Sequence, residues 1–198
     1  MESISKITTS FMLYAPQIYA LNGFARISFK KDTQKFLDVG CGFRKLPGAV
    51  GVDADPSTDA DVAHDLEKFP WPFADGEFDL ILMSHVLEHL SNTAKTLREV
   101  HRVGKPGARV VIQIPYFRSP DAFSDPTHKH FFTIESETFL LAEGYERVGF
   151  WIGWPHRSRN PIKEAFKQYV HQHPKFYESH LSLLFPTECL TWELEVKK

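Results

Sequence analysis

Short apolar runs alternate with amphipathic segments along most of this chain. A strand buried on both faces reads as a continuous apolar run that turn residues end. Seven segments fit this pattern and are predicted strands: 35–40, 49–53, 61–63, 78–83, 109–114, 147–152 and 190–196. Strands that alternate with helices form a mostly parallel sheet with helices on both faces. The pattern therefore predicts an α/β fold, a doubly wound sheet of the Rossmann-like type.

Helical periodicity fills the gaps between these strands. Ser84 is expected to cap a short helix that ends at Leu90, and Ser91 or Asn92 to cap a longer one. The turn residues Gly-Lys-Pro-Gly at 104–107 are expected to end that longer helix. Two further helical segments are predicted, at 134–143 and, basic and aromatic, at 161–184.

The apolar stretch nearest the start, residues 11–29, is interrupted by Pro16, Asn22 and Arg26 among others. A bilayer crossing needs about 20 apolar residues, so no membrane span is expected. Residues 16–31 fit a helix that covers the domain, with a lid or a membrane-surface helix as alternatives. The acidic Glu2 and the broken apolar core argue against a signal peptide.

The 198 residues fit one domain, 1–198, with a helical cover at 1–34, a core at 35–115 and a further part at 116–198. The formal net charge of -2 argues against a dedicated nucleic-acid binder, which usually carries a basic excess. Two cysteines are too few for a disulfide framework and fit a reducing cytoplasm. The oligomeric state stays open.

Residues that could bind a ligand cluster where the predicted strands end. The residues concerned are Asp38, Gly40, Cys41, Gly42, Asp53, Asp65, Leu66, Ser84 and His85. Ligands of open α/β sheets bind beyond the carboxyl ends of the strands. Glycines let the backbone approach a ligand closely, and an acid after the second strand can accept both hydroxyl protons of a ribose. These strand ends together predict a nucleoside site.

Four segments carry a family resemblance: LDVGCG, GVDADP, AHDLEKFPWPFADGEFDLILMSHVLEHL and LREVHRVGKPGARVVIQIP. With them the chain resembles the class I S-adenosylmethionine-dependent methyltransferases, in particular the small, type 11-like members. The resemblance implies a seven-stranded sheet whose last strand, 190–196, is antiparallel. It also implies S-adenosyl-L-methionine as cofactor, bound by 35–115, and a methyl acceptor bound by 116–198.

The resemblance also implies a role for each residue at the strand ends. Gly40, Cys41 and Gly42 would border the methionine part of the cofactor, while Asp38 would help to hold its ammonium group. Asp53 would contact the ribose. Asp65 and Leu66 would contact the adenine, and Ser84 and His85 would line the sulfonium side.

One departure from the family concerns the segment GFRKLPGA, which alone separates Cys41 from Val50. A parallel crossover normally takes a dozen or more residues, usually including a helix. The chain is therefore expected to run almost directly into the second strand. The helix N-terminus that would face the cofactor carboxylate is then missing, and Arg44 or Lys45 could supply positive charge instead.

The segment HVLEHL, 85–90, contains H-x-x-E-H, the inverted zinc-protease motif. A zinc hydrolase is the alternative that it raises, but such a site needs a third protein ligand. Its position after a buried strand favours a methyltransferase. His85 and His89 are then interpreted as a cofactor-side residue and a residue packed or exposed nearby.

Residues 116–133 form a long segment after the fifth strand, where the methyl acceptor is expected. A histidine, His128 or His130, could remove a proton from a hydroxyl acceptor, and Asp125 could orient His128. A divalent metal held by Asp121, Asp125 and the histidines is one alternative, and a capped turn is another. The DPTH sequence resembles that of some saccharide methyltransferases.

Residues 156–175 are basic, and Arg157 and Arg159 could grip an anionic group of the substrate. The preferred interpretation is a solvated helix face with Phe166, Tyr169 and Val170 turned inward.

The leading hypothesis for function is methyl transfer to a small-molecule hydroxyl. A regulatory or partner protein that binds the cofactor without catalysis is the alternative, favoured by the missing helix.

Overall fold

The structure is a computed structural model that describes residues 34–153 and 160–198. The predicted helix at 16–31, the cover at 1–34 except Gln34, and Arg157 and Arg159 lie outside the described residues.

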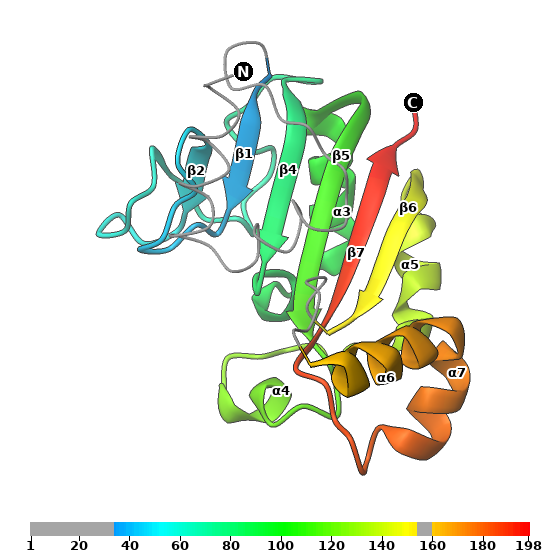
Figure 1. Ribbon diagram of the computed structural model, residues 1–198. Helices are drawn as coiled ribbons and strands as arrows, with labels where there is room; N and C mark the ends of the chain where they lie inside the picture. The colour runs from blue at the N-terminus through cyan, green and yellow to red at the C-terminus, as the bar shows by residue number, and fades with distance from the viewer. Residues whose placement is uncertain (1–33, 154–159) are drawn as a thin grey trace.

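Seven strands form one sheet in the order β3-β2-β1-β4-β5-β7-β6 (Figure 1). Only β7 runs antiparallel, and it pairs with β5 on one side and β6 on the other. The fold and the antiparallel last strand are as predicted. The strands are β1 (Phe36–Val39), β2 (Val50–Asp53), β3 (Val62–Ala63), β4 (Phe78–Ser84), β5 (Gly104–Pro115), β6 (Tyr145–Ile152) and β7 (Cys189–Val196).

Eight short or medium helices lie within the described residues. They are η1 (Leu87–His89), α3 (Thr93–Val103), α4 (Asp121–Ser124), η2 (Ile134–Ser136), α5 (Glu137–Leu141), α6 (Pro161–Gln172), α7 (Pro174–Phe176) and η3 (Tyr177–Leu181). Asn92 caps α3 by accepting a hydrogen bond from the Lys95 backbone. Leu97, Val100 and Val103 of α3 are fully buried, as their spacing predicts.

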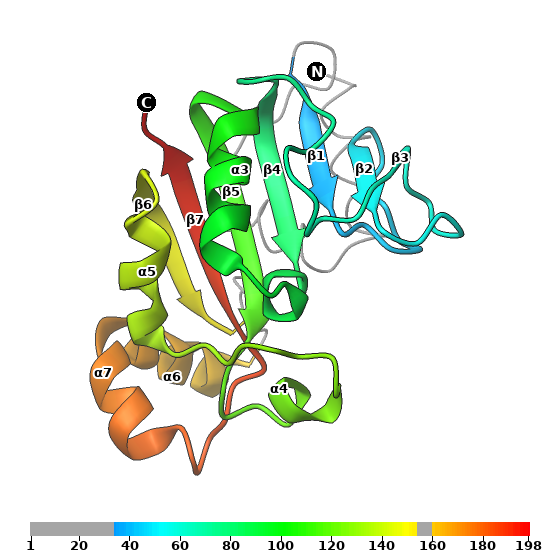
Figure 2. The same cartoon turned by 180° about the vertical axis from the view of Figure 1, so that it is seen from behind.

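Helices lie on both sides of the sheet. Figure 2 shows α3 and α5 against one face, and α6 lies toward the opposite side, at the carboxyl end of β6. The short α4 lies beyond the carboxyl end of β5, next to η1 and its loop. The carboxyl-end edge of the sheet therefore brings together segments that lie far apart in the sequence, from residue 40 to residue 187.

Two local predictions were wrong. Ser84 does not cap a helix, because it is the last residue of β4 and only the single 3-10 turn η1 follows. The predicted start of the fifth strand at 109 was also wrong: Gly104 ends α3 as predicted, but residues 104–107 already belong to β5, because Gly104 is extended and pairs with Phe78. In both places sheet pairing extends a strand into residues that favour turns on local grounds.

The crossover from β1 to β2 runs without a helix, as predicted, and places Leu37 opposite Val50. Leu46 is buried and anchors the crossover, and its backbone N–H donates to Asp38. Asp61 anchors the other side, since its carboxylate accepts from Lys45 at 2.6 Å and from the Gly51 backbone. The buried side chain of Leu46 and the carboxylates of Asp38 and Asp61 thus hold this crossover in place without a helix.

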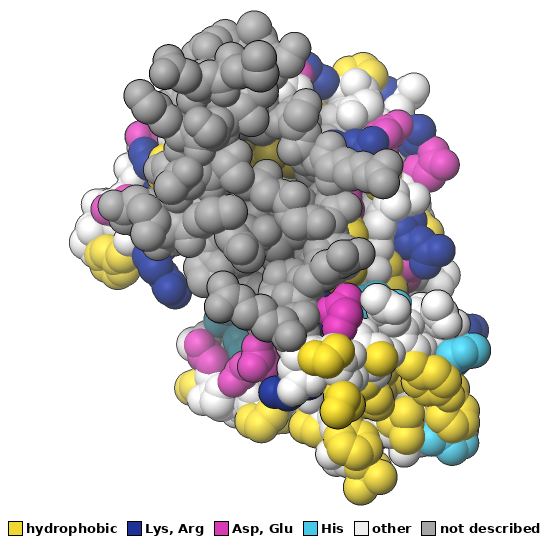
Figure 3. All heavy atoms as spheres, in the orientation of Figure 1, with side chains coloured by type: hydrophobic (Ala, Val, Ile, Leu, Met, Phe, Trp, Pro, Cys, Tyr) yellow, Lys and Arg dark blue, Asp and Glu magenta, His cyan; other side chains and the backbone are white. Residues whose placement is uncertain are grey.

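The surface in Figure 3 carries a hydrophobic patch over α6 and the residues after η3. The expectation that Phe166 and Tyr169 face inward was wrong, because they are 37% and 42% exposed. Only Val170 of the three is buried, at 3% exposure, and α6 meets β6 through a hydrogen bond from the Ile152 backbone to His171.

None of the described helices combines the length and the apolar character that a bilayer crossing requires. Both cysteines, Cys41 and Cys189, are buried free thiols.

Candidate functional site

A cavity of about 340 Å³ opens at the carboxyl ends of β1 and β4. Its volume falls within the range of small-molecule sites, about 300 to 1,000 Å³. Six of the residues predicted from the strand ends line it: Asp38, Gly40, Cys41, Gly42, Ser84 and His85. The remaining lining residues are Phe43, Arg44, Leu46 and Leu82.

Two glycines give the first loop its shape. Gly40 and Gly42 have φ values of 63° and 54°, which few other residues adopt without strain. A Cβ at Gly40 would also lie 2.4 Å from a methyl group of Val86. A Cβ at Gly42 would meet no atom of residues 34–153 or 160–198 within 4 Å, and Gly42 lines the cavity. The first glycine is needed for packing, and the second leaves room for a ligand.

Asp53 at the end of β2 holds the glycine loop in place. One carboxylate oxygen accepts from the Gly42 backbone at 2.9 Å, and the other accepts from the Asp55 backbone at 3.0 Å. Each carboxylate oxygen has a second lone pair that can accept another hydrogen bond. Asp53 can therefore keep these two contacts and still bind the hydroxyl groups of a ribose.

Asp38 presents a buried carboxyl group to the cavity, at 4% exposure. Burial raises the pKa of this group to about 6, and the negative charge of Asp53 acts in the same direction. The hydrogen bond from Leu46 and the positive charge of Lys45 oppose this rise. Burial also raises the pKa of the Cys41 thiol to about 12, so this cysteine is a neutral part of the wall.

Asp65 and Leu66, the predicted adenine contacts, follow β3. Asp65 is exposed, and its carboxylate accepts from the Glu67 backbone. Leu66 is 5% exposed and belongs to the core, where its carbonyl accepts from the indole N–H of Trp71. Trp71 draws the chain inward directly after the two-residue strand β3. Neither Asp65 nor Leu66 lines the cavity.

The far wall of the cavity is built by Ser84 and His85. Ser84 donates to the side chain of Gln113, and the His85 backbone donates to the Gln113 carbonyl at 2.8 Å. His85 has a φ of 57°, a conformation that costs free energy for a residue with a Cβ and that often marks functional sites. Gln113 thus fixes the position of both residues.

Sequence reasoning missed Phe43, Leu46, Leu82 and Gln113. Gln113 is the one with a visible signal, because it is a polar residue within the apolar strand RVVIQI. It is 1% exposed, and its amide group also donates to Thr191 of β7. Phe43 is 67% exposed and lines the cavity, which no periodicity could indicate. Of the two predicted cations, Arg44 lines the cavity and Lys45 pairs with Asp61.

The acceptor-side segment is folded by its own turns. Asp125 does not orient His128 as expected, because its carboxylate accepts from the backbone and hydroxyl of Thr127. The Nδ1 of His128 instead bonds the Ala122 carbonyl at 2.9 Å. The Nε2 of His130 is buried and has no hydrogen-bond partner within the described part of the chain.

The H-x-x-E-H segment is split by the structure. His85 lines the cavity, with Nδ1 3.4 Å from the carboxylate of Glu88. His89 points elsewhere, because its Nδ1 lies 2.8 Å from the hydroxyl of Thr127. Glu88 is 1% exposed. A zinc site shared by His85 and His89 with Glu88 as base is therefore not formed.

Known families and proteins match part of the chain. The profile of the family described as "Methyltransferase domain" matches residues 37–112. Ajmaline N-methyltransferase from Rauvolfia serpentina is 28% identical over 151 residues, covering 56% of this chain and 52% of its own. Tocopherol O-methyltransferase from Arabidopsis thaliana is 31% identical over 106 residues, covering 42% and 30%. The chain spans about half or less of the length of these curated relatives.

Solved structures match nearly the whole chain. An S-adenosylmethionine-dependent methyltransferase from Mesorhizobium loti superposes with a TM-score of 0.62 at 18% identity, over 91% of this chain and 98% of its own. One from Archaeoglobus fulgidus has the same TM-score and identity, over 96% and 93%. The sheet order and the antiparallel β7 described above are thus those of a methyltransferase fold.

Proposed function

We propose that this chain, whose residues 37–112 are a methyltransferase domain, transfers a methyl group from S-adenosyl-L-methionine to a small-molecule acceptor. The observation that carries the proposal is the cavity at the carboxyl ends of β1 and β4, with the Gly42 backbone lining it and a carboxylate beside it.

The chemistry of the residues around the cavity fits this cofactor. An ammonium group would find the carboxyl of Asp38, and a carboxylate would find Arg44. Asp53 keeps free lone pairs for a ribose diol. The cofactor supplies an electrophilic methyl group on a sulfonium sulfur.

Asp65 and Leu66 extend the proposed site toward the adenine. The exposed carboxylate of Asp65 is available to the adenine amino group. Leu66 would act indirectly on the adenine ring and not by direct contact. The hydrogen bond that its carbonyl accepts from Trp71 would set the position of the backbone next to Asp65.

The acceptor is proposed to be a hydroxyl compound, and a saccharide is one class to test. Support comes from the two histidines of the segment after β5, at the same edge of the sheet as the cavity. One of them, His128 or His130, is proposed to remove the proton of the hydroxyl. His130 is the stronger candidate for the general base, because a buried imidazole nitrogen without a partner is costly unless a ligand uses it.

The test is methyl transfer from labelled S-adenosyl-L-methionine across sugars, phenols, amines and small acids. Titration calorimetry with S-adenosylhomocysteine gives a second readout. Transfer to a hydroxyl acceptor is expected. Tight cofactor binding without transfer to any acceptor class would favour the non-catalytic alternative, and absence of binding would contradict both.

Cofactor affinity is expected to fall when the pH drops from 7 to 5. An ammonium group prefers the ionised form of Asp38, and this form is lost as the pH falls through a pKa of about 6. At one unit below the pKa about one tenth of the carboxyls are ionised, so affinity for S-adenosylhomocysteine at pH 5 should be roughly tenfold weaker. Calorimetry at the two pH values measures this.

The matched control is Asp38→Asn, which keeps the shape and removes the titration. Its affinity should be weaker at pH 7 and nearly independent of pH over this range. An equal pH dependence in the wild type and this variant would remove Asp38 from ammonium binding.

A further inference from the structure

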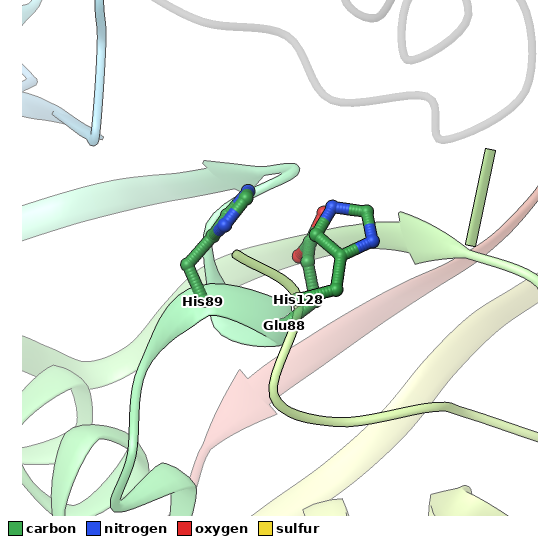
Figure 4. Close-up of side chains that lie close together, drawn as sticks. All are labelled: Glu88, His89 and His128. Atoms are coloured by element: carbon green, nitrogen blue, oxygen red, sulfur yellow. The ribbon is translucent and has the colours of Figure 1, made fainter. Parts of the chain in front are cut away.

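Three side chains that could bind a metal ion meet beside the proposed site (Figure 4). Glu88 and His89 come from η1, and His128 comes from the segment that follows α4. One ligand atom of each residue lies within 4.8 Å of the other two. The rings of His89 and His128 have centroids 4.6 Å apart.

Glu88 is a buried carboxylate that lacks hydrogen-bond partners among the described residues. It is 1% exposed, and neither of its carboxylate oxygens has a hydrogen-bond partner within the described residues. The one charge partner recorded for it is His85, at 3.4 Å, which is a cation only when protonated. A buried carboxylate normally pairs with a cation or binds a metal ion. The position therefore calls for positive charge.

His128 is held so that Nε2 is free to bind a metal. Its Nδ1 bonds the carbonyl oxygen of Ala122, and a carbonyl can only accept. The Nδ1 must therefore carry the proton, and Nε2 of the neutral ring keeps its lone pair. Metal-binding histidines commonly donate their second N–H to such an acceptor.

His89 is held in the same way by a relay of two residues. The hydroxyl of Thr127 donates to Asp125 at 2.7 Å and so can accept from the Nδ1–H of His89 at 2.8 Å. Nε2 of His89 then also keeps its lone pair. The capped turn of Asp125 and Thr127 thus sets the tautomer of a histidine 38 residues earlier.

Two backbone hydrogen bonds join the two segments. The N–H groups of Lys129 and His130 both donate to the carbonyl of Glu88, at 2.8 and 3.3 Å. The backbone therefore holds His128 close to Glu88 and His89. Ligand atoms around a tetrahedral zinc ion lie roughly 3.4 Å apart, so small side-chain rotations would complete the geometry.

We propose that Glu88, His89 and His128 bind a divalent transition-metal ion. Two imidazoles and one carboxylate favour zinc and its neighbours over magnesium or calcium, which prefer oxygen ligands. Three protein ligands leave one position of a tetrahedral ion for an oxygen atom of water or of a small molecule. This site differs from the set of Asp121, Asp125 and the loop histidines considered on sequence grounds.

The test uses the full chain after removal of metals with a chelator, without cofactor or acceptor. Calorimetric titration with Zn²⁺ should give one ion per chain, and Co²⁺ should give the visible absorption of a tetrahedral site. His128→Ala and Glu88→Gln should each weaken Zn²⁺ binding at least 100-fold. Thr127→Val, which removes the acceptor for His89 together with the hydroxyl hydrogen bond to Asp125, should weaken it about 10- to 100-fold.

His180→Ala is the matched control, because this histidine of η3 is exposed and lies outside the cluster, so its affinity should equal that of the wild type. Circular dichroism checks that each variant folds, and His89→Ala replaces Glu88→Gln if the latter does not. Failure of the wild-type chain to bind Zn²⁺ or Co²⁺ stoichiometrically would overturn the proposal, as would unchanged affinity in the folded variants. Neither result bears on methyl transfer, because no cofactor is present.

Discussion

Replacement of His130 by alanine is expected to lower the turnover of methyl transfer by about 10² to 10⁴, the usual effect of losing a general base. The reason is the buried Nε2 of His130, which has no hydrogen-bond partner among the residues that the structure describes and so can accept a proton from the acceptor. Turnover on a hydroxyl acceptor found in the screen measures the effect.

Cofactor affinity separates a lost base from a damaged fold. His130→Ala should bind S-adenosylhomocysteine almost as tightly as the wild type, because His130 does not line the cavity. His173→Ala, which changes an exposed histidine at the end of α6, should keep full turnover. If His130→Ala turns over at the wild-type rate, His130 is not the base, and catalysis would rest on positioning the acceptor.

Replacement of Asp53 by alanine is expected to weaken S-adenosylhomocysteine binding by about 5- to 150-fold. The change removes the proposed acceptor for the ribose hydroxyls and leaves the Gly42 backbone N–H without its partner. Unsatisfied polar groups of this kind cost about 1 to 3 kcal/mol each. Titration calorimetry at pH 7 measures the loss.

Asp53→Asn is the informative companion. Its amide oxygen can still accept from Gly42, while its NH₂ group cannot accept a hydroxyl proton. The glycine loop should stay in place, and affinity should lie between those of the wild type and Asp53→Ala. Wild-type affinity in both folded variants would show that Asp53 holds the loop and does not touch the cofactor.

The sheet and most of the cavity could be predicted because both depend on local sequence. A central strand such as Phe78–Ser84 is buried on both faces and must be apolar throughout, which a reader can see without a structure. Parallel strands also end at one edge, so Asp38 and Ser84 were expected to meet there. Both line the cavity.

Predictions from local rules failed where distant segments compete for the same residues. Ser84 has the chemistry of a helix cap, but pairing with Gln113 of β5 keeps it in the sheet. Phe166 fits the apolar face of an amphipathic helix, yet it stays 37% exposed and packs edge-on against Phe185, far along the chain.

The sequence by itself determined the order of the strands along the chain, the position of the glycine loop and the chemistry at the strand ends, because periodicity and turn residues act over a few positions. Only the tertiary structure decided the partners and the charge state of the polar groups. The raised pKa of Asp38 and the meeting of Glu88 with His128 depend on burial and on contacts between segments far apart in the chain. Burial and long-range contact arise only when the whole sheet forms, so no local pattern can encode them.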